Sequence, residues 1–293
     1  MKTQSLSGYG YHPVSLAASS DGNILVIGTD KDVVRLDPVS LDIMWPFKTE
    51  NYSGKVQVMI SPDNQSTYAS TAGAVFALDL NVTKKGQQAI DTGGQESRIA
   101  IDANGALVAL GTFGNTAVYT APNLEQRLWI TKMDNGSGPT TVLFNGMALY
   151  VADSGFIWQM DALHGGSPVH TVEVGPEAGY KEARLVLDEA KQRLYVGING
   201  YAGSYSAINL DRQYLISLPE SGYSVTDVVS DGNSGIFANN ARVSVVNGNG
   251  RVAARNDLDG YGNRNTNLAL LGNDRVIASP DGYVVGLLML EKP

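Results

Sequence analysis

The residues of this chain that could do chemistry are few, and no two of the strongest candidates form a known catalytic pattern. The three histidines, His12, His164 and His170, do not show the spacing of a metal site. The chain has no cysteine, which excludes thiol nucleophiles, disulfides and cysteine-based zinc sites together. No nucleophile elbow, P-loop or H-E-x-x-H motif occurs. We therefore predict no catalytic residue, no metal and no cofactor.

Charge and hydropathy narrow the classes of partner. The 21 Lys and Arg against 29 Asp and Glu give a net charge of −8, which argues against nucleic acid. No apolar stretch is long enough to span a membrane, and Met1–Gly10 lacks the apolar core of a signal peptide. We expect no membrane insertion and a cytoplasmic or virion-associated protein.

Two sets of turn residues recur along the chain with one period. They mark the repeating elements that would position any functional side chain. The first set advances in steps of 41 to 43 residues: Asp21, Asp63, Asn104, Asn145, Asp188, Asp231 and Gly272. The second set begins with steps of 42, 42 and 40 residues and has one longer step of 48 at the insertion 200–203: Asp37, Asp79, Ala121, Asp161, Asn209 and Asn247. Two independent markers with one period indicate a repeat protein.

Each repeat is predicted to form four short strands. In the first repeat, β-branched and aromatic residues bounded by turns predict strands at Val14–Ala18, Ile24–Gly28, Val33–Asp37 and Ile43–Thr49. A period of about 42 matches the roughly 40–50 residues of a four-stranded β-propeller blade. The repeat is therefore predicted to be one blade.

The sequence thus predicts an all-β fold, a seven-bladed β-propeller with four-stranded antiparallel blades. The last repeat lacks a fourth strand, and Lys2–Ser7 stands where a fourth strand precedes the first blade. We expect this N-terminal strand to close the ring by pairing with the last blade. The prediction is one domain, 1–293, with blades at 14–49, 56–92, 97–132, 140–174, 182–219, 225–258 and 266–290 plus 2–7.

Several segments carry a family resemblance: Val34–Asp37 with Met44-Trp45, Val75–Asp79, and Val118-Tyr119 with Leu128-Trp129. They resemble the repeats of quinoprotein-like and YVTN-type propellers. The chain departs from quinone-cofactor enzymes in its seven repeats, its lack of vicinal cysteines and its two repeat tryptophans. The resemblance therefore implies the fold and says little about chemistry. Trp45, Trp129 and Trp158 are predicted to pack between blades.

The loops that join one blade to the next, and second strands to third strands, share one face of a propeller. Half of the 14 tyrosines fall in these loops. Tyrosine with Gly, Ser and Asn is typical of adaptable recognition surfaces, although packing at blade junctions would also explain the rings. The predicted binding residues of this loop face are Tyr9, Tyr11, His12, Tyr52, Tyr180, Tyr201, Tyr223, Tyr261 and Asn263.

A second set of polar residues precedes the first strands, which line the central channel: Lys55, Glu96, Thr140, Lys181, Glu182, Arg264 and Asn265. With His12 they could bind a polar ligand or a hard cation, or they could form solvated ion pairs at a hydrated channel mouth. The favoured hypothesis is a non-catalytic binding or assembly module for a protein or glycan partner, such as a virion or phage-tail structural or receptor-binding component. The alternative is a propeller lyase or lactonase-type hydrolase that uses the channel mouth.

Overall fold

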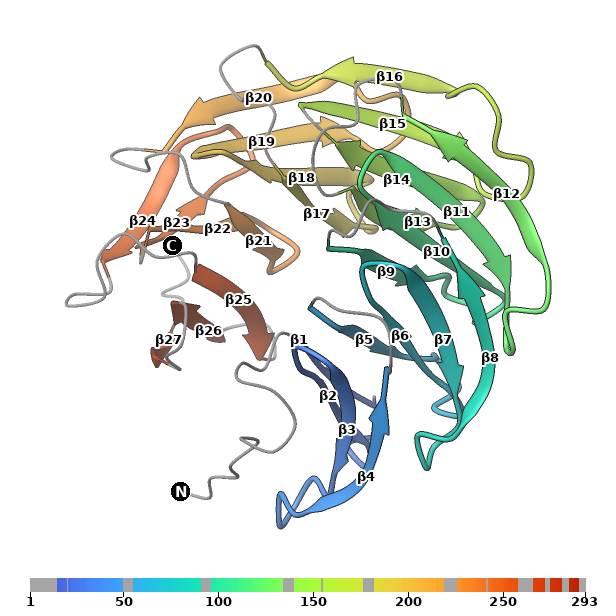
Figure 1. Ribbon diagram of the computed structural model, residues 1–293. Helices are drawn as coiled ribbons and strands as arrows, with labels where there is room; N and C mark the ends of the chain where they lie inside the picture. The colour runs from blue at the N-terminus through green and yellow to red at the C-terminus, as the bar shows by residue number, and fades with distance from the viewer. Residues whose placement is uncertain are drawn as a thin grey trace. The chain divides into compact units, whose positions relative to one another are not determined.

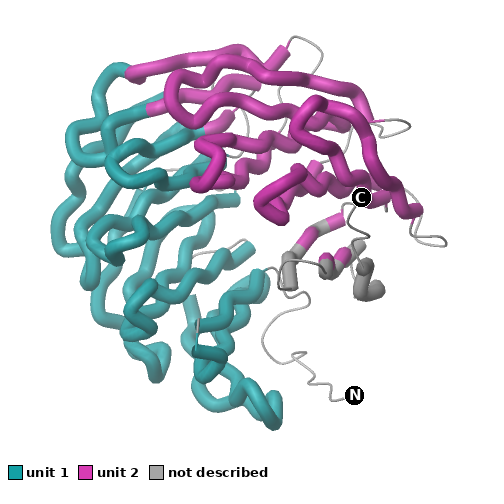
Figure 2. Tube along the Cα trace, turned by 180° about the vertical axis from the view of Figure 1, so that it is seen from behind, with its two compact units in different colours: residues 1–151, 160–167 teal, residues 152–159, 168–293 magenta. Residues whose placement is uncertain are grey.

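Strands make up all of the regular structure that the computed structural model describes. The described residues are 15–19, 21–49, 55–90, 96–133, 140–153, 155–175, 182–218, 226–240, 242–257, 266–271, 275–280 and 285–289. Two compact units divide the chain, residues 1–151 with 160–167 and residues 152–159 with 168–293 (Figure 2). Among the described residues, no helix has the length and hydropathy of a membrane span.

The first three sheets lie in the first unit, and each is a four-stranded antiparallel meander (Figure 1). Sheet 1 comprises β1 (Ser15–Ala18), β2 (Leu25–Gly28), β3 (Asp32–Leu36) and β4 (Ile43–Lys48). Sheet 2 comprises β5 (Gln57–Ile60), β6 (Thr67–Ser70), β7 (Ala74–Leu78) and β8 (Lys84–Ala89). Sheet 3 comprises β9 (Arg98–Ile101), β10 (Leu107–Thr112), β11 (Asn115–Thr120) and β12 (Arg127–Lys132).

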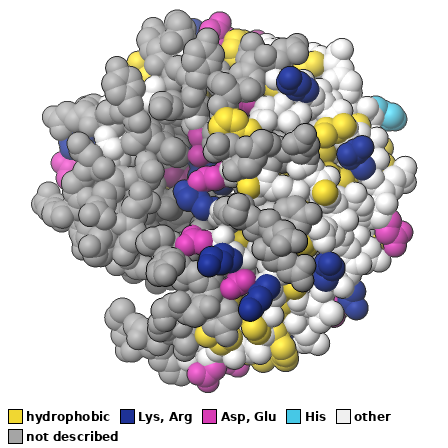
Figure 3. Space-filling view, viewed as in Figure 1, with side chains coloured by type: hydrophobic (Ala, Val, Ile, Leu, Met, Phe, Trp, Pro, Cys, Tyr) yellow, Lys and Arg dark blue, Asp and Glu magenta, His cyan; other side chains and the backbone are white. Residues whose placement is uncertain are grey.

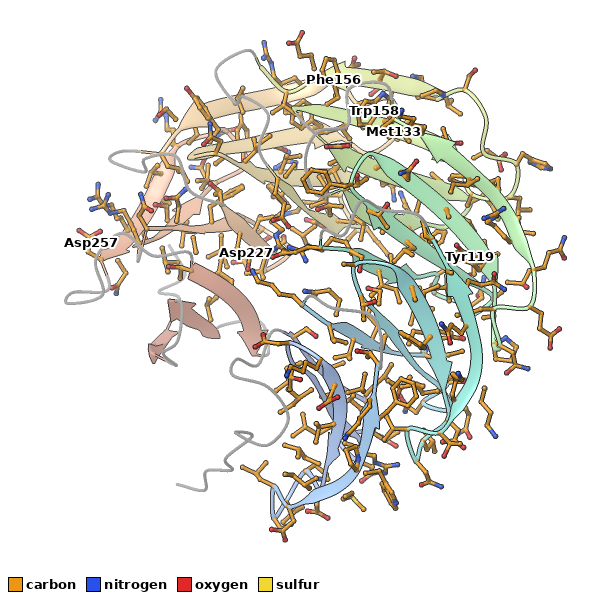
Figure 4. The ribbon with its side chains drawn as sticks, viewed as in Figure 1. Tyr119, Met133, Phe156, Trp158, Asp227 and Asp257 are labelled. Carbon is orange, nitrogen blue, oxygen red and sulfur yellow. The ribbon has the colours of Figure 1, made fainter. Side chains whose placement is uncertain are left out.

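The fourth sheet contributes residues to both units. It comprises β13 (Thr141–Asn145), β14 (Ala148–Asp153), β15 (Phe156–Asp161) and β16 (His170–Glu173). In the second unit, the rings of Phe156 and Trp158 are stacked with centroids 5.7 Å apart (Figure 4).

The remaining sheets belong to the second unit. Sheet 5 comprises β17 (Ala183–Asp188), β18 (Arg193–Ile198), β19 (Tyr201–Ser206) and β20 (Arg212–Ser217). Sheet 6 comprises β21 (Asp227–Ser230), β22 (Gly235–Asn239), β23 (Arg242–Val246) and β24 (Val252–Asp257). Sheet 7 has three strands, β25 (Thr266–Leu271), β26 (Arg275–Pro280) and β27 (Val285–Met289).

The all-β class and the four-stranded antiparallel repeat are confirmed, and the strands of the first repeat lie within one residue of the predicted limits. The predicted number of four-stranded sheets is wrong, because six rather than seven occur in the described part of the chain. The difference lies in sheet 7, whose fourth strand was assigned to Lys2–Ser7. That segment is outside the described residues.

In the four-stranded sheets, burial is highest in the second and third strands and lower in the fourth strands. Every residue of β6, β10 and β22 is buried, and these strands read as nearly continuous runs of small and apolar side chains. A strand with packed sheets on both faces needs such a run instead of strict alternation. The fourth strand β8 carries Lys84 and Lys85 on its exposed residues.

Neighbouring sheets within each unit share apolar cores. Between sheets 1 and 2, the rings of Phe47 and Phe76 meet edge to face at 5.4 Å, next to Val33 and Val58. In the second unit, Tyr195 of sheet 5 meets Phe237 of sheet 6 at 6.4 Å. Large rings placed across each junction bury the surface that holds successive sheets together.

The inner parts of the sheets approach so closely that glycine is required. A Cβ atom on Gly111 would lie 2.3 Å from the carbonyl oxygen of Thr140. A Cβ atom on Gly197 would lie 2.4 Å from the carbonyl oxygen of Thr226. Both glycines are on second strands, and both oxygens belong to the residue that precedes the next first strand. This contact fixes where each first strand begins.

Candidate functional site

The predicted loop face falls mainly outside the described residues. Eight of its nine predicted members are not described: Tyr9, Tyr11, His12, Tyr52, Tyr180, Tyr223, Tyr261 and Asn263. Their role as binding residues stays a prediction. Tyr201 is the member whose position the structure gives.

Tyr201 begins β19 and is not part of an inserted loop, as the sequence analysis had placed it. Asn199 and Gly200, with φ of 44° and 82°, form a two-residue turn that pairs Ile198 with Tyr201. Two successive positive φ angles match the twist of a tight hairpin, so the extra residues lengthen the two strands. The Gly200 N–H donates to Thr226 Oγ1 at 2.8 Å, which anchors the turn to the start of sheet 6. The partly exposed Tyr201 ring therefore stands on a fixed backbone.

Six described tyrosines lie outside the loops, and they pack in or against the core; Tyr214, on β20, is partly buried against the core of sheets 5 and 6. Tyr68, Tyr119, Tyr150, Tyr195 and Tyr205 are fully buried. Burial raises the pKa of the Tyr119 hydroxyl to about 12, because the phenolate would lose its hydration. These rings fill the junctions between sheets and offer nothing to a partner.

In the first unit, the channel-mouth residues form an ion-pair cluster. Lys55 Nζ lies 2.6 Å from Glu96 Oε1, and Arg98 Nη2 lies 3.3 Å from Glu96 Oε2. Glu96 thus stands between two cations, and the cluster carries a net charge of +1. Thr140, in the same predicted set, is fully buried where sheet 3 meets sheet 4.

In the second unit, a related cluster contains one basic and two acidic groups, Arg184, Glu182 and Asp227. Arg184 Nε lies 2.9 Å from Glu182 Oε1. Asp227, partly buried at the start of β21, accepts a hydrogen bond from the Leu268 N–H at 2.7 Å (Figure 4). Burial raises the pKa of the Asp227 carboxyl group, and the Arg184 guanidinium opposes that rise. Lys181, Arg264 and Asn265 lie outside the described residues.

The sequence analysis missed Arg98, Arg184 and Asp227. A signal for the two arginines was present, because the pattern Glu-x-Arg occurs at both 96–98 and 182–184. In each case the glutamate precedes a first strand and the arginine lies within it. The contact of Asp227 with the next sheet depends on the register between sheets and leaves no such signal. Acidic and basic side chains are interspersed on one face of the molecule (Figure 3).

The described part of the chain contains no group of three or more His, Asp or Glu residues that could hold a metal. His164 Nδ1 lies 3.1 Å from Asp161 Oδ1 within a turn, and His170 begins β16. The two histidines therefore belong to separate local structures.

The periodic acidic residues hold turns. Asp21 Oδ1 accepts the Asn23 N–H at 3.0 Å, and Asp63 Oδ1 accepts the Gln65 N–H at 3.0 Å. In the equivalent turn of sheet 3, where the repeat marker is Asn104, the nearby Asp102 accepts the Leu107 N–H at 2.6 Å. Short aspartate side chains that accept backbone N–H groups two to five residues on stabilise such turns. The repeat markers are structural.

Comparison with known proteins identifies the type of fold. No protein-family model and no curated protein sequence matches the chain. Among solved structures, BamB from Moraxella catarrhalis is 19% identical, with a TM-score of 0.69 over 92% of this chain and 82% of that chain. The Cps50 (Swd1) β-propeller domain of Myceliophteria thermophila is 14% identical, with a TM-score of 0.71 over 92% and 93% of the two chains. Saccharomyces cerevisiae Sqt1 is 12% identical, with a TM-score of 0.76 over 99% and 89%.

These similarities support the β-propeller fold that the repeats predict. At such identities they show the fold alone. The narrower resemblance to quinoprotein-like and YVTN-type propellers stays a prediction.

Proposed function

We propose that the protein is a non-catalytic binding or assembly module that takes a protein partner on its loop face. The observation that carries this proposal is the difference in burial between Tyr201 and the core tyrosines. Five described tyrosines are fully buried and Tyr214 packs, partly buried, against the core of sheets 5 and 6, whereas Tyr201 is partly exposed on an anchored hairpin. Rigid, half-exposed aromatic rings are the usual anchors of a binding surface.

The ion pairs of the channel mouth support a non-catalytic role. Glu96 is shared between Lys55 and Arg98, and Glu182 pairs with Arg184. A general acid or base must reach the proton that it transfers, and these carboxylates are engaged by cations. We therefore prefer binding to the lyase or hydrolase alternative.

Narrower versions of the proposal concern the partner and the assembly. A glycan is the second class of ligand for a Tyr-, Asn- and Gly-rich face, and a virion or phage tail is a setting in which such a module would act.

We also propose that residues 1–293 form one seven-bladed domain in which Lys2–Ser7 supplies the last strand. The complete exposure of β24, next to a three-stranded sheet, supports this closure.

The experiment compares Tyr201→Ala with Asn104→Ala. Asn104 is exposed in the β9–β10 hairpin turn and serves as the matched control. Binding is measured on an array of immobilised glycans and by titration of a protein captured from the native source and then purified. We expect Tyr201→Ala to raise the dissociation constant at least about tenfold, typical of an aromatic anchor, and Asn104→Ala to leave it unchanged.

Both variants should melt like the wild-type protein. Equal binding by the wild-type protein and Tyr201→Ala would contradict the proposed face. Binding to glycans and to no protein would assign the face to the other ligand class.

A further inference from the structure

Two polar residues occupy the same position in sheets 1 and 6. Ser15 is the first residue of β1 and pairs with Gly28 of the second strand. Asp227 is the first residue of β21 and pairs with Ala238 of the second strand. Each side chain reaches the first strand of the following sheet, so each forms a link between neighbouring sheets.

The serine makes two hydrogen bonds. Ser15 Oγ donates to the Val56 carbonyl at 2.9 Å and accepts from the Val58 N–H at 2.9 Å. A hydroxyl group can do both because it carries one proton and two lone pairs. It therefore bridges a carbonyl and an N–H group that lie two residues apart on one strand edge.

The aspartate makes the equivalent acceptor bond, but its side chain can carry a different number of protons. Asp227 Oδ2 accepts from the Leu268 N–H at 2.7 Å, as Ser15 accepts from Val58. Two residues before Leu268 lies Thr266, just as Val56 lies two residues before Val58. An ionised carboxylate is an acceptor only and cannot donate to that carbonyl, whereas a protonated one can.

We propose that Asp227 is a proton-controlled latch between sheets 6 and 7. In its neutral form the carboxyl group takes one proton from solvent, donates it to the Thr266 carbonyl and keeps the bond from the Leu268 N–H. The neutral form thereby reproduces the bridge that Ser15 makes. On ionisation the proton returns to solvent, the bond to Thr266 is lost and sheet 7 is held less tightly.

The surroundings of Asp227 set the direction of the effect. Its charged neighbours are Arg184, which favours the ionised form, and Glu182, which favours the protonated form. Burial also favours the protonated form, and the net result is a raised pKa. A group with a raised pKa in the folded state stabilises the fold at low pH, and that contribution is lost as the pH rises through the raised pKa.

The latch predicts local behaviour that differs from the rest of the chain. Asp21, Asp63 and Asp161 have lowered pKa values because they accept hydrogen bonds in turns, so their contribution is lost as the pH falls. A global melting curve would combine these two opposite pH dependences of stability. The measurement must therefore report on β25 alone.

Amide hydrogen exchange of the full-length protein at pH 5 and pH 8 supplies that readout, with protection factors corrected for intrinsic exchange. In the wild-type protein, we expect about tenfold more protection of Leu268 and its β25 neighbours at pH 5 than at pH 8. Asp227→Asn carries an acceptor and a donor at every pH, so its protection should be high and independent of pH. Asp227→Ser should copy Ser15 and behave in the same way.

Two further variants separate the latch from a general loss of stability. Asp227→Ala lacks both bonds and should show low protection of β25 at both pH values. Asp231→Asn, in the neighbouring turn, should keep the wild-type pH dependence of β25. If the wild-type protein and Asp227→Asn share one pH dependence, or if Asp227→Ala is protected like the wild-type protein at pH 5, the latch is wrong.

Discussion

At the scale of single residues, the junction of sheets 3 and 4 depends on one aromatic ring and one glycine. Trp129 Nε1 donates to the Ala162 carbonyl at 2.9 Å, and its ring lies against the turn that contains Gly165. Gly165 has a φ of 60°, and a Cβ atom there would lie 2.5 Å from Trp129 Cδ2. The turn therefore needs glycine for its backbone conformation and for its close contact with the ring.

The chain offers a matched pair to separate these two requirements. Gly146 has a φ of 57° with open space around its missing Cβ atom. Gly146→Ala should lower the free energy of unfolding by about 1–2 kcal/mol, the strain of a left-handed alanine. Gly165→Ala should cost about 1–3 kcal/mol more, because the new methyl group displaces the Trp129 ring.

Urea denaturation monitored by tryptophan fluorescence measures both changes. The Gly165→Ala spectrum should also report greater exposure of the indole. Equal losses in the two variants would mean that the contact with Trp129 contributes nothing to stability.

The tryptophans show what the repeat pattern predicts and what it misses. Trp129 and Trp158 are buried, as the sequence analysis expected. Trp45 is 37% exposed, and the Arg35 guanidinium lies 5.0 Å from its ring centroid. The prediction of a core position for Trp45 is wrong. Equivalent places in a repeat share a strand and a register, but the neighbouring turn decides how deeply a side chain is covered.

At the scale of elements, the turns between third and fourth strands share one pattern of hydrogen bonds, in which a side-chain oxygen accepts two backbone N–H groups. The oxygen belongs to a carboxylate in some turns and to an amide in another. Asp161 Oδ1 accepts the N–H groups of Leu163 and His164 at 2.8 and 2.9 Å. Asn247 Oδ1 accepts the N–H groups of Asn249 and Arg251 at 3.0 and 3.1 Å in the turn of sheet 6. An amide and a carboxylate thus do the same structural work, but only the carboxylate titrates.

Exchange of these two residues should exchange their response to acid. The His164 N–H, the His164 side chain and the Leu163 N–H hold the pKa of Asp161 below its usual range. Its stabilisation is present above the pKa of an unfolded aspartate, about 4, and is lost as the pH falls through the lower folded value. Asp161→Asn should therefore flatten the fall in melting temperature between pH 7 and pH 3, and Asn247→Asp should steepen it.

Calorimetry of the two variants and of the wild-type protein at several pH values tests this exchange. The double variant serves as the control and should resemble the wild-type protein, because it carries one titrating turn in place of another. Parallel acid curves for all four proteins would contradict the assigned role of the turn aspartates.

The sequence predicted the strands well because each depends on local composition and on turns that recur in the chain. The limits of β1 to β4 differ from the predicted ones by a single residue at most. The link from Asp227 to Leu268 could not be predicted, because it spans 41 residues and depends on how two sheets are set against each other. The loop face was predicted from composition and stays a prediction; Tyr201, its described member, is partly exposed.

At the scale of the whole molecule, the last two sheets differ from the others within the described residues. All six residues of β24 are exposed, whereas β4, β8, β12, β16 and β20 each have residues that are at least partly covered. Sheet 7 packs on sheet 6 through Val276 and Ala278 and has only three strands in the described part of the chain. A fourth strand beside β27 would stand next to β24 and would cover it.

We expect Lys2–Ser7 to be that strand, so deletion of residues 1–8 should lower the melting temperature and promote association. Without the segment, β27 presents the backbone edge of a Val-, Leu- and Met-containing strand, which is a template for pairing with another chain. Opening of sheet 7 would also expose the core that it shares with sheet 6. Calorimetry and light scattering measure the two effects, and a synthetic peptide of residues 1–8 should reverse both. An ordinary chain end contributes little, and its removal would be almost silent. A truncated protein that stays monomeric and melts like the full chain would therefore show that another segment, or none, completes sheet 7.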